Sequence, residues 1–250
     1  MMNNDFKRRI EEASLNAWPA INQLIFDGWI LRFSKGYTKR ANSVNPLYSA
    51  NYDYTKKIKV CEALYKKNNL PTIFRLNSFS NSAGLDKELE RLNYQYIVKA
   101  SVMYLNLKKE VVDPSIRSIF KEQTLENWMK IFVNLSQNHR NNNQVIHKDI
   151  LKKIFPESVF MALSVENRYV SCCLAVIEDG LCGLFDLITD TAFRRKGYAA
   201  QLMKKMLALG KERGAHHAYL QVVCSNRPAI QLYEKLGFKK LYHYWYRIKR

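Results

Sequence analysis

The stretch TAFRRKGYAAQLMKKML, residues 191–207, places three cations directly before a glycine and then begins a helix-like pattern. Apolar side chains recur after the glycine at the i, i+3, i+4 spacing of a helix with one buried face; they are Ala199, Leu202, Met203, Met206 and Leu207. The spacing predicts a helix that begins near Gly197, and Gly214 can end it in the left-handed conformation. The first N–H groups of a helix lack partners within the helix and carry partial positive charge. This turn therefore predicts a site for a large anion such as a pyrophosphate.

The charge and the small size of the residues in this turn also favour an anion site. Arg194, Arg195 and Lys196 add positive charge, and Gly197 and Ala199 leave room for an anion to touch the backbone. An isolated R-x-x-G-x-A pattern also arises by chance as an ordinary strand-to-helix turn whose cations are solvated. The choice between the two interpretations needs a second signal.

That signal is SNRPAIQLYEKLGF, residues 225–238. Ser225 or Asn226 can cap a short helix, Pro228 suits its first turn and Gly237 can end it. With the strand-like LFDLITD before the turn, residues 184–238 resemble the GNAT superfamily of N-acetyltransferases. The matching residues are LFDLITD, RRKGYA and N-x-x-A-x-x-L-Y-x-x-x-G-F. The resemblance implies an α/β (α+β) fold with a mixed, mostly antiparallel sheet flanked by helices. It also implies transfer of the acetyl group of acetyl-CoA to a primary amine, by direct attack in a ternary complex.

The resemblance implies roles for single residues. The strand before the turn would offer backbone groups to the pantetheine arm at Leu187, Ile188 and Thr189. The phosphates would lie against the turn and the first helical residues, which are Arg194, Arg195, Lys196, Gly197, Tyr198, Ala199 and Ala200. Asn226 matches the asparagine that contacts the pantetheine arm, and Ala229 follows in the same motif. Tyr233 matches the tyrosine that protonates the departing thiolate; without the motif, a core aromatic would be the better interpretation of this residue.

The general base stays open. Some relatives carry glutamate at the strand position that Gln221 takes here, and glutamine cannot accept the proton. Asp186, the nearest carboxylate on the neighbouring strand, is the candidate base, and a purely structural carboxylate is an equal alternative. A water chain, or an amine that is already partly neutral, would need no dedicated base.

The resemblance extends faintly into the first half of the chain. In PTIFRLN and the residues that follow, Leu92-Asn93-Tyr94 stands where Leu-Gly-Phe would be. We therefore expect a degenerate GNAT-like domain at residues 1–110 and a catalytic, acetyl-CoA-binding GNAT domain at residues 111–250, with a linker at 108–118. The turn before the first domain's helix at 53–69 holds Tyr52, Asp53 and Tyr54, which are too bulky and partly too acidic for a pyrophosphate. This half would shape the acceptor site or stabilise the second half.

Spacing and composition also predict individual elements. Helices are predicted at 5–17, 53–69, 82–94, 124–136, 145–155 and 197–212, and a short helix is predicted after residue 226. Strands are predicted at 28–34, 71–77, 96–107, 159–167, 168–179, 182–190, 218–224 and 241–249, with 38–48 extended.

Composition limits the class of protein. Hydrophobic residues make up 47% of the 250 residues, as in ordinary globular proteins, and the chain shows neither a membrane-length apolar run nor a signal-peptide core at its start. Five cysteines without metal-ligand spacing fit a reduced, cytoplasmic protein without a metal. Adjacent Cys172 and Cys173 should lie on opposite faces of a strand.

The net charge of +18 should attract phosphate groups. Its cations are spread along both halves, whereas dedicated nucleic-acid binders concentrate theirs, so binding of nucleic acid or the ribosome stays open but is not favoured. A catalytically weak acyl-CoA-binding protein is the second alternative, because Gln221 permits it. The acceptor, a small molecule or a protein amino group, cannot be identified from these residues, and a homodimer stays open.

Overall fold

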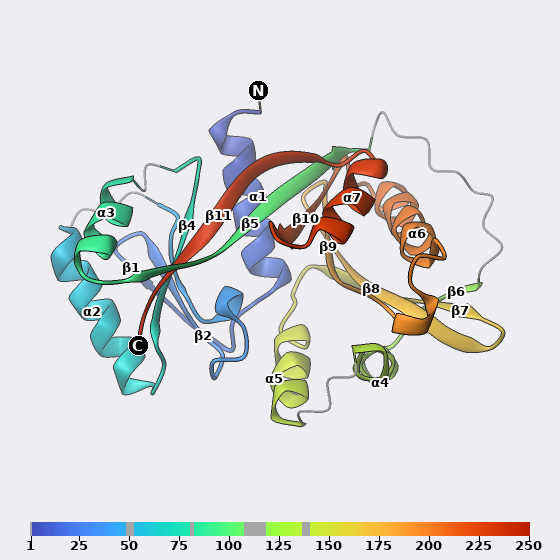
Figure 1. Ribbon diagram of the computed structural model, residues 1–250, viewed down its shortest axis with the longest axis horizontal. Helices are drawn as coiled ribbons and strands as arrows, with labels where there is room; N and C mark the ends of the chain where they lie inside the picture. The colour runs from blue at the N-terminus through green and yellow to red at the C-terminus, as the bar shows by residue number, and fades with distance from the viewer. Residues whose placement is uncertain (1, 49–52, 81–82, 108–118, 137–140) are drawn as a thin grey trace.

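Two long strands, β5 (Gln95–Asn106) and β11 (Lys239–Lys249), run through the middle of one 11-stranded sheet (Figure 1). The computed structural model describes residues 2–48, 53–80, 83–107, 119–136 and 141–250. From one edge to the other, the strands are β1 (Asn22–Phe26), β2 (Trp29–Phe33), β3 (Val44–Pro46), β4 (Thr72–Asn77), β11, β5, β10 (His217–Val223), β9 (Leu181–Thr189), β8 (Arg168–Glu178), β7 (Glu157–Val165) and β6 (Ile119–Gln123). The neighbours β3–β4 and β9–β10 are parallel, and the other pairs are antiparallel. The predicted mixed, mostly antiparallel sheet is confirmed.

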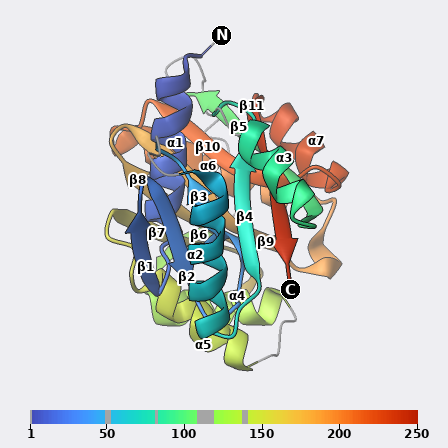
Figure 2. The same cartoon turned by 90° about the vertical axis from the view of Figure 1, so that its left-hand side faces the viewer.

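Helices cover both faces of this sheet. One face carries α1 (Asn4–Ala17), α4 (Leu125–Ser136) and α5 (Asn141–Leu151), which share a hydrophobic core with β8 and β11. The other face carries α2 (Tyr54–Lys67) and α3 (Ala83–Arg91) over β4 (Figure 2), and α6 (Tyr198–Glu212) and α7 (Arg227–Lys235) over the second half of the sheet. Alternation along β8 sends Cys172 into the first core and Cys173 into the second, as the sequence predicted.

The order of elements repeats within the chain. The series β3-α2-β4-α3-β5 in the first half matches β9-α6-β10-α7-β11 in the second. The last strand of each series lies in the other half: β11 pairs with β4 and β5, and β5 pairs with β10 and β11. The two halves therefore complete each other's sheet. The division at residues 110 and 111 stays a prediction, because 108–118 lie outside the described residues.

Most predicted elements form within one to four residues of their expected ends. Residues 38–48 were expected to be extended throughout, but residues 39–41 form a 3-10 turn, η1 (Lys39–Ala41), and β3 is short. The sequence did not predict β1 or β6. Four of the five residues in β1 are exposed, so this edge strand lacks the alternation that marks a half-buried strand.

No helix in the described part of the chain is long and apolar enough to cross a membrane. Among the same residues, no cluster of three or more histidine, cysteine, aspartate or glutamate side chains has a geometry that could hold a metal ion.

Candidate functional site

The parallel strands β9 and β10 separate in the middle of the sheet. They pair from Leu181–His217 to Leu184–Leu220 and no further. Beyond that point β10 continues along β5, and β9 continues along β8. A cavity of about 250 Å³ opens where the strands part; its lining residues are Arg40, Leu184–Leu187, Met203, Leu220–Val223, Tyr233 and Tyr244. Backbone groups on the facing edges of the two strands therefore have no ladder partner there and can bind a ligand.

A β-bulge shapes the cavity side of β9. Cys172 on β8 pairs with Ile188 and Leu174 pairs with Phe185, so two residues, Asp186 and Leu187, lie opposite one. Asp186 takes a left-handed φ of 50°, which is uncommon for a residue other than glycine. The bulge re-aims the side chain of Asp186, which lines the cavity.

The carboxylate of Asp186 is held by a histidine. Its Oδ2 lies 2.8 Å from Nε2 of His147 on α5, and the side chains are 13% and 2% exposed. Four aromatic rings surround this imidazole at centroid distances of 4.9 to 6.4 Å: Trp18, Tyr37, Trp128 and Phe132. The second oxygen, Oδ1, accepts no hydrogen bond from the residues that the structure describes. Asp186, which lines the cavity, is thus fixed in direction and keeps one oxygen without a hydrogen bond from those residues.

Tyr233 lies on α7 at another wall of the same cavity. Burial raises its pKa to about 12, and the nearby Cys173 thiol raises it in the same direction. The hydroxyl therefore keeps its proton at neutral pH and can donate it. Gln221 on β10 also lines the cavity and accepts a 3.1 Å hydrogen bond at Oε1 from the Tyr244 hydroxyl.

The turn before α6 has the open backbone that the sequence predicted. Arg195 and Gly197 both have left-handed φ, 64° and 87°, and Gly197 is the N-cap without any side-chain cap bond. A Cβ placed on Gly197 would meet only Gln201 Nε2, at 4.0 Å. Arg195 and Lys196 are exposed, and the first N–H groups of a 15-residue helix face this space. The arrangement fits a phosphate group, which needs unpaired N–H donors, nearby cations and room to approach.

Other predicted residues have structural partners of their own. Arg194 donates from Nε to the Thr189 carbonyl at 3.2 Å, which ties the turn to the end of β9. Ile188 and Thr189 pair with β8, whereas Leu187 lines the cavity. Asn226 caps α7 by accepting from the Ala229 N–H at 3.3 Å. Tyr198, Ala199 and Ala200 form the first turn of α6 and are half-buried.

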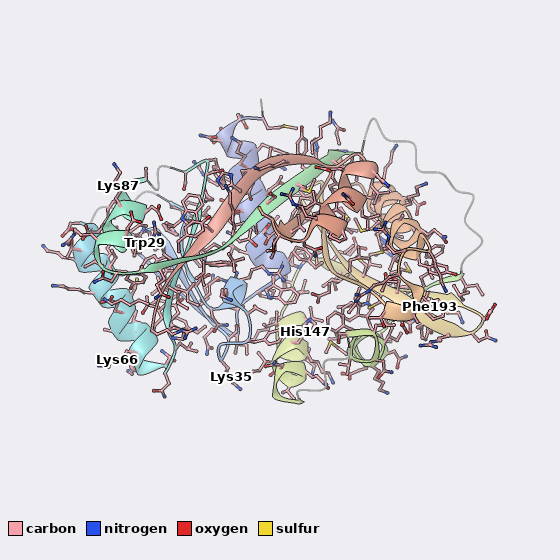
Figure 3. The ribbon with its side chains drawn as sticks, viewed as in Figure 1. Trp29, Lys35, Lys66, Lys87, His147 and Phe193 are labelled. Carbon is pink, nitrogen blue, oxygen red and sulfur yellow. The ribbon has the colours of Figure 1, made fainter. Side chains whose placement is uncertain are left out.

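The cavity and the turn lie at different places along the molecule. Figure 3 shows His147 on α5 near the middle and Phe193, on the 3-10 turn η2 (Thr191–Phe193) before α6, toward one end. Strand β9 joins the two places, with Asp186 at its bulge and Thr189 at its end. The site therefore suits a long ligand with an anionic end and a reactive end.

Sequence reasoning missed Arg40, which lines the cavity, and His147, which contacts the Asp186 carboxylate. His147 shares a helical face with the buried Ile150 and Leu151, and a histidine at that spacing could have been noticed. Arg40 stands in the irregular segment TKRANSVN, whose pattern gives no sign that it lies beside Asp186.

Comparisons with known proteins agree with this fold. Residues 7–247 match the family model described as probable histone acetyltransferase Rv0428c, C-terminal. The chain is 27% identical over 251 residues, covering 97% of it and 98% of the relative, to YobR of Bacillus subtilis (strain 168), an uncharacterized N-acetyltransferase. A GCN5-related N-acetyltransferase from Kribbella flavida has the same fold with a TM-score of 0.71, at 13% identity and over 97% of this chain and 95% of that one. A tandem GNAT protein from the clavulanic acid biosynthesis pathway superposes with a TM-score of 0.56 at 10% identity, over 75% and 67% of the two chains.

Proposed function

Because the chain belongs to the family of the probable histone acetyltransferase Rv0428c C-terminal region, within the GNAT superfamily of N-acetyltransferases, we propose that it acetylates a primary amine with acetyl-CoA in a ternary complex. The observation that carries the proposal is the parting of β9 and β10 over a cavity, with a glycine-started helix at the far end of β9. Relatives that are N-acetyltransferases favour an enzyme over a non-catalytic acyl-CoA-binding protein and over a nucleic-acid- or ribosome-associated protein.

Each end of the cosubstrate has residues suited to it. The turn from Arg194 to Ala200 would hold the diphosphate through backbone N–H groups, Arg195 and Lys196. The free edge of β9 near Leu187 would hydrogen-bond the pantetheine amides, with Asn226 and Ala229 at the facing helix start. When bound, acetyl-CoA supplies an acetyl carbonyl activated as a thioester.

The side chains of the cavity can move the protons of this reaction. The incoming ammonium loses one proton to solvent, and Asp186 Oδ1 takes the second as the C–N bond forms at the acetyl carbonyl. An N–H group on the free edge of β9 can stabilise the carbonyl oxygen. Tyr233 gives its proton to the sulfur as the C–S bond breaks, and the proton on Asp186 restores the tyrosine through solvent. The products are the N-acetylated amine and a free thiol, with one proton released overall.

A high pKa does not disqualify Tyr233 as this acid. An ordinary thiol has a pKa of about 8.5, well below the tyrosine's value of about 12. The burial that raises the pKa of Tyr233 would also raise the pKa of a thiol that leaves beside it, and so narrow the gap. Holding the two substrates together supplies the orientation that attack requires.

Titration calorimetry with coenzyme A tests the cosubstrate site directly. Gly197→Glu places bulk and a negative charge on the turn, and we expect coenzyme A to bind at least about 100-fold more weakly. Gly214→Glu is the matched control: it adds the same side chain at a similar left-handed φ, 85° against 87°, at the other end of α6, where a Cβ meets nothing within 4 Å. We expect this control to bind within about 3-fold of wild type. Equal losses in both variants, or no binding to the wild-type chain at moderate salt, would overturn the proposal.

A further inference from the structure

An arginine from the first half of the chain lines the cavity. Arg40, on η1, lines the same cavity as Asp186. Its guanidinium carbon lies 4.5 Å from the centre of the Trp18 ring and 6.0 Å from that of Phe185. The side chain forms no ion pair and donates no hydrogen bond to the residues that the structure describes. Arg40 therefore keeps its five N–H donors for a ligand while the rings hold it in place.

The segment that carries Arg40 is built rigidly. The buried Arg32 donates to the Arg40 carbonyl at 2.9 Å and also to the Trp18 carbonyl, so it fixes the backbone on both sides of the stacked pair. Asn42 accepts from the Ser34 N–H at 2.7 Å and donates to the Thr38 carbonyl at 2.7 Å. These bonds replace sheet pairing in residues 34–42. Because the Arg40 side chain is already positioned, little conformational entropy is lost when it binds a ligand.

Arg40 and Asp186 act on one neighbourhood with opposite charges. The Tyr37 ring stacks on the His147 ring at a centroid distance of 5.6 Å, and the charges of both Asp186 and Arg40 act on its hydroxyl. Burial and the Asp186 carboxylate raise the pKa of Tyr37 to about 12, and Arg40 opposes them. His147 occupies only Oδ2 of Asp186, so the carboxylate keeps one oxygen for a donor. The cavity thus offers a partner for an anion and a partner for an amine.

From this pairing we infer that the acceptor is a small amine that also carries a carboxylate, such as an amino acid, with Arg40 binding the carboxylate and Asp186 facing the amine. The inference rests on the proposed function and narrows its acceptor. A guanidinium matches a carboxylate with two parallel hydrogen bonds. The volume of about 250 Å³ lies below the roughly 300–1,000 Å³ of pockets for drug-sized ligands. The net charge of +18 raises the local concentration of anionic substrates.

Matched pairs of acceptors test the carboxylate requirement. The pairs are each proteinogenic L-amino acid and its carboxamide, together with β-alanine, 4-aminobutanoate and O-phosphoethanolamine. Free-thiol release is measured at saturating acetyl-CoA and expressed per neutral amine. We expect at least one amino acid to exceed its carboxamide about 10- to 100-fold in kcat/KM, the range for losing charge-assisted hydrogen bonds.

Variants assign that preference to Arg40. Arg40→Met keeps the length and apolar stem of the side chain, and we expect it to raise the acceptor KM and bring acid and amide within about 3-fold of each other. Arg40→Lys should restore part of the preference, since it keeps the charge but not the paired geometry. Lys39→Met removes a cation from the exposed neighbouring position of η1 and should leave the preference unchanged.

The possible outcomes distinguish a failure of this inference from a failure of the proposed acetyltransferase function. If wild type binds no coenzyme A, the proposed function fails and the inference fails with it. If coenzyme A binds, two results overturn the carboxylate site alone. One is turnover of carboxamides or peptide N-termini that equals or exceeds turnover of the amino acids. The other is the absence of turnover with every carboxylated amine. A preference that only O-phosphoethanolamine shows identifies a phosphate as the anion and also overturns it. A preference that survives in Arg40→Met refutes the role of Arg40.

Discussion

The helices α2 and α6 occupy matching positions in the two halves of the chain but begin in opposite ways. Helix α2 is capped by Asp53, whose Oδ1 accepts from the Thr55 N–H at 2.8 Å. Helix α6 is capped by Gly197, which has no side chain, and cations precede it. The first arrangement fills the helix start with a carboxylate that belongs to the protein, and the second leaves it open to an outside anion.

The ends of the same helices are alike. Asn69 after α2 and Gly214 after α6 both take left-handed φ and donate to the carbonyl three residues back, at 3.0 and 3.1 Å. Asn93 after α3 and Gly237 after α7 repeat this pattern, at 2.9 Å each. The two halves therefore share the turns that build the scaffold and differ in the turn that would bind the cosubstrate. This comparison supports one cosubstrate site for each chain, in the second half.

The contrast extends to the chemical groups on the matching helices. Tyr94 donates its N–H to the Leu89 carbonyl at 2.9 Å, and Phe238 donates to the Tyr233 carbonyl at 3.0 Å, so Leu89 and Tyr233 are equivalent positions. Leu89 is fully buried in the core of the first half, whereas Tyr233 lines the cavity. In the same way, β3 of the first half ends at Pro46, where β9 continues into the bulge with Asp186. We therefore expect the catalytic losses below to follow from substitutions in the second half.

The largest loss of activity is expected from the carboxylate at the bulge. Asp186→Asn removes the proposed proton acceptor at nearly constant volume, and we expect kcat to fall about 1,000-fold while coenzyme A affinity changes less than about 3-fold. Single-turnover rates and calorimetry measure the two quantities. A fall of less than about 5-fold would make Asp186 a structural carboxylate and favour a water chain or a partly neutral amine.

His147 tests whether the direction of that carboxylate matters. His147→Phe keeps a ring among the surrounding aromatic rings but removes the 2.8 Å contact with Asp186 Oδ2. We expect kcat to fall about 10-fold, and His147→Gln, which can still donate to the carboxylate, to recover part of it. Because His147 would act as a positioning residue, the pH profile of kcat should shift in the Phe variant. An unchanged profile with lowered stability would show a role in packing alone.

The loss expected at the tyrosine is smaller than the loss expected for Asp186→Asn. Tyr233→Phe removes the hydroxyl and leaves the ring. Because water can supply part of the proton transfer, we expect kcat to fall about 10- to 100-fold, with coenzyme A affinity unchanged. Since the pKa of Tyr233 is raised to about 12, its proton is present at all lower pH values and only lost above that value. The rate should therefore rise with pH as the acceptor amine loses its proton. At pH values below 10, loss of the Tyr233 proton should not lower the rate.

The comparison of wild type and Phe variant decides this assignment. Both profiles should have the same shape below pH 10 and differ in height. Equal heights would remove the acid from the mechanism. A decline of the wild-type rate between pH 8 and 10 that is missing in the variant would contradict the direction of the pKa shift.

The sequence predicted the helix starts of the candidate site, which short-range rules determine. Gly197 and Asn226 mark helix starts, and the three cations lie beside one of them, so a window of a few residues contains the signal. The surroundings of Asp186 are different, because only packing between distant segments brings Arg40 to the same cavity and His147 to the carboxylate. The exchange of β5 and β11 between the halves is equally non-local. No window of the sequence shows that β11 lies between β4 and β5.

The smallest effect is expected at the start of α2, and it tests whether the first half binds the cosubstrate at all. Asp53→Ala removes the cap on the Thr55 N–H, and we expect a loss of about 1 kcal/mol in the free energy of unfolding, measured by denaturant titration. Asp53→Asn keeps an oxygen acceptor and should lose less than half of that. Coenzyme A should bind both variants with one site per chain and within about 2-fold of the wild-type affinity. A second binding event in Asp53→Ala would mean that a single carboxylate is what separates the two halves, and a loss of the one site would place the cosubstrate in the first half instead of at Gly197.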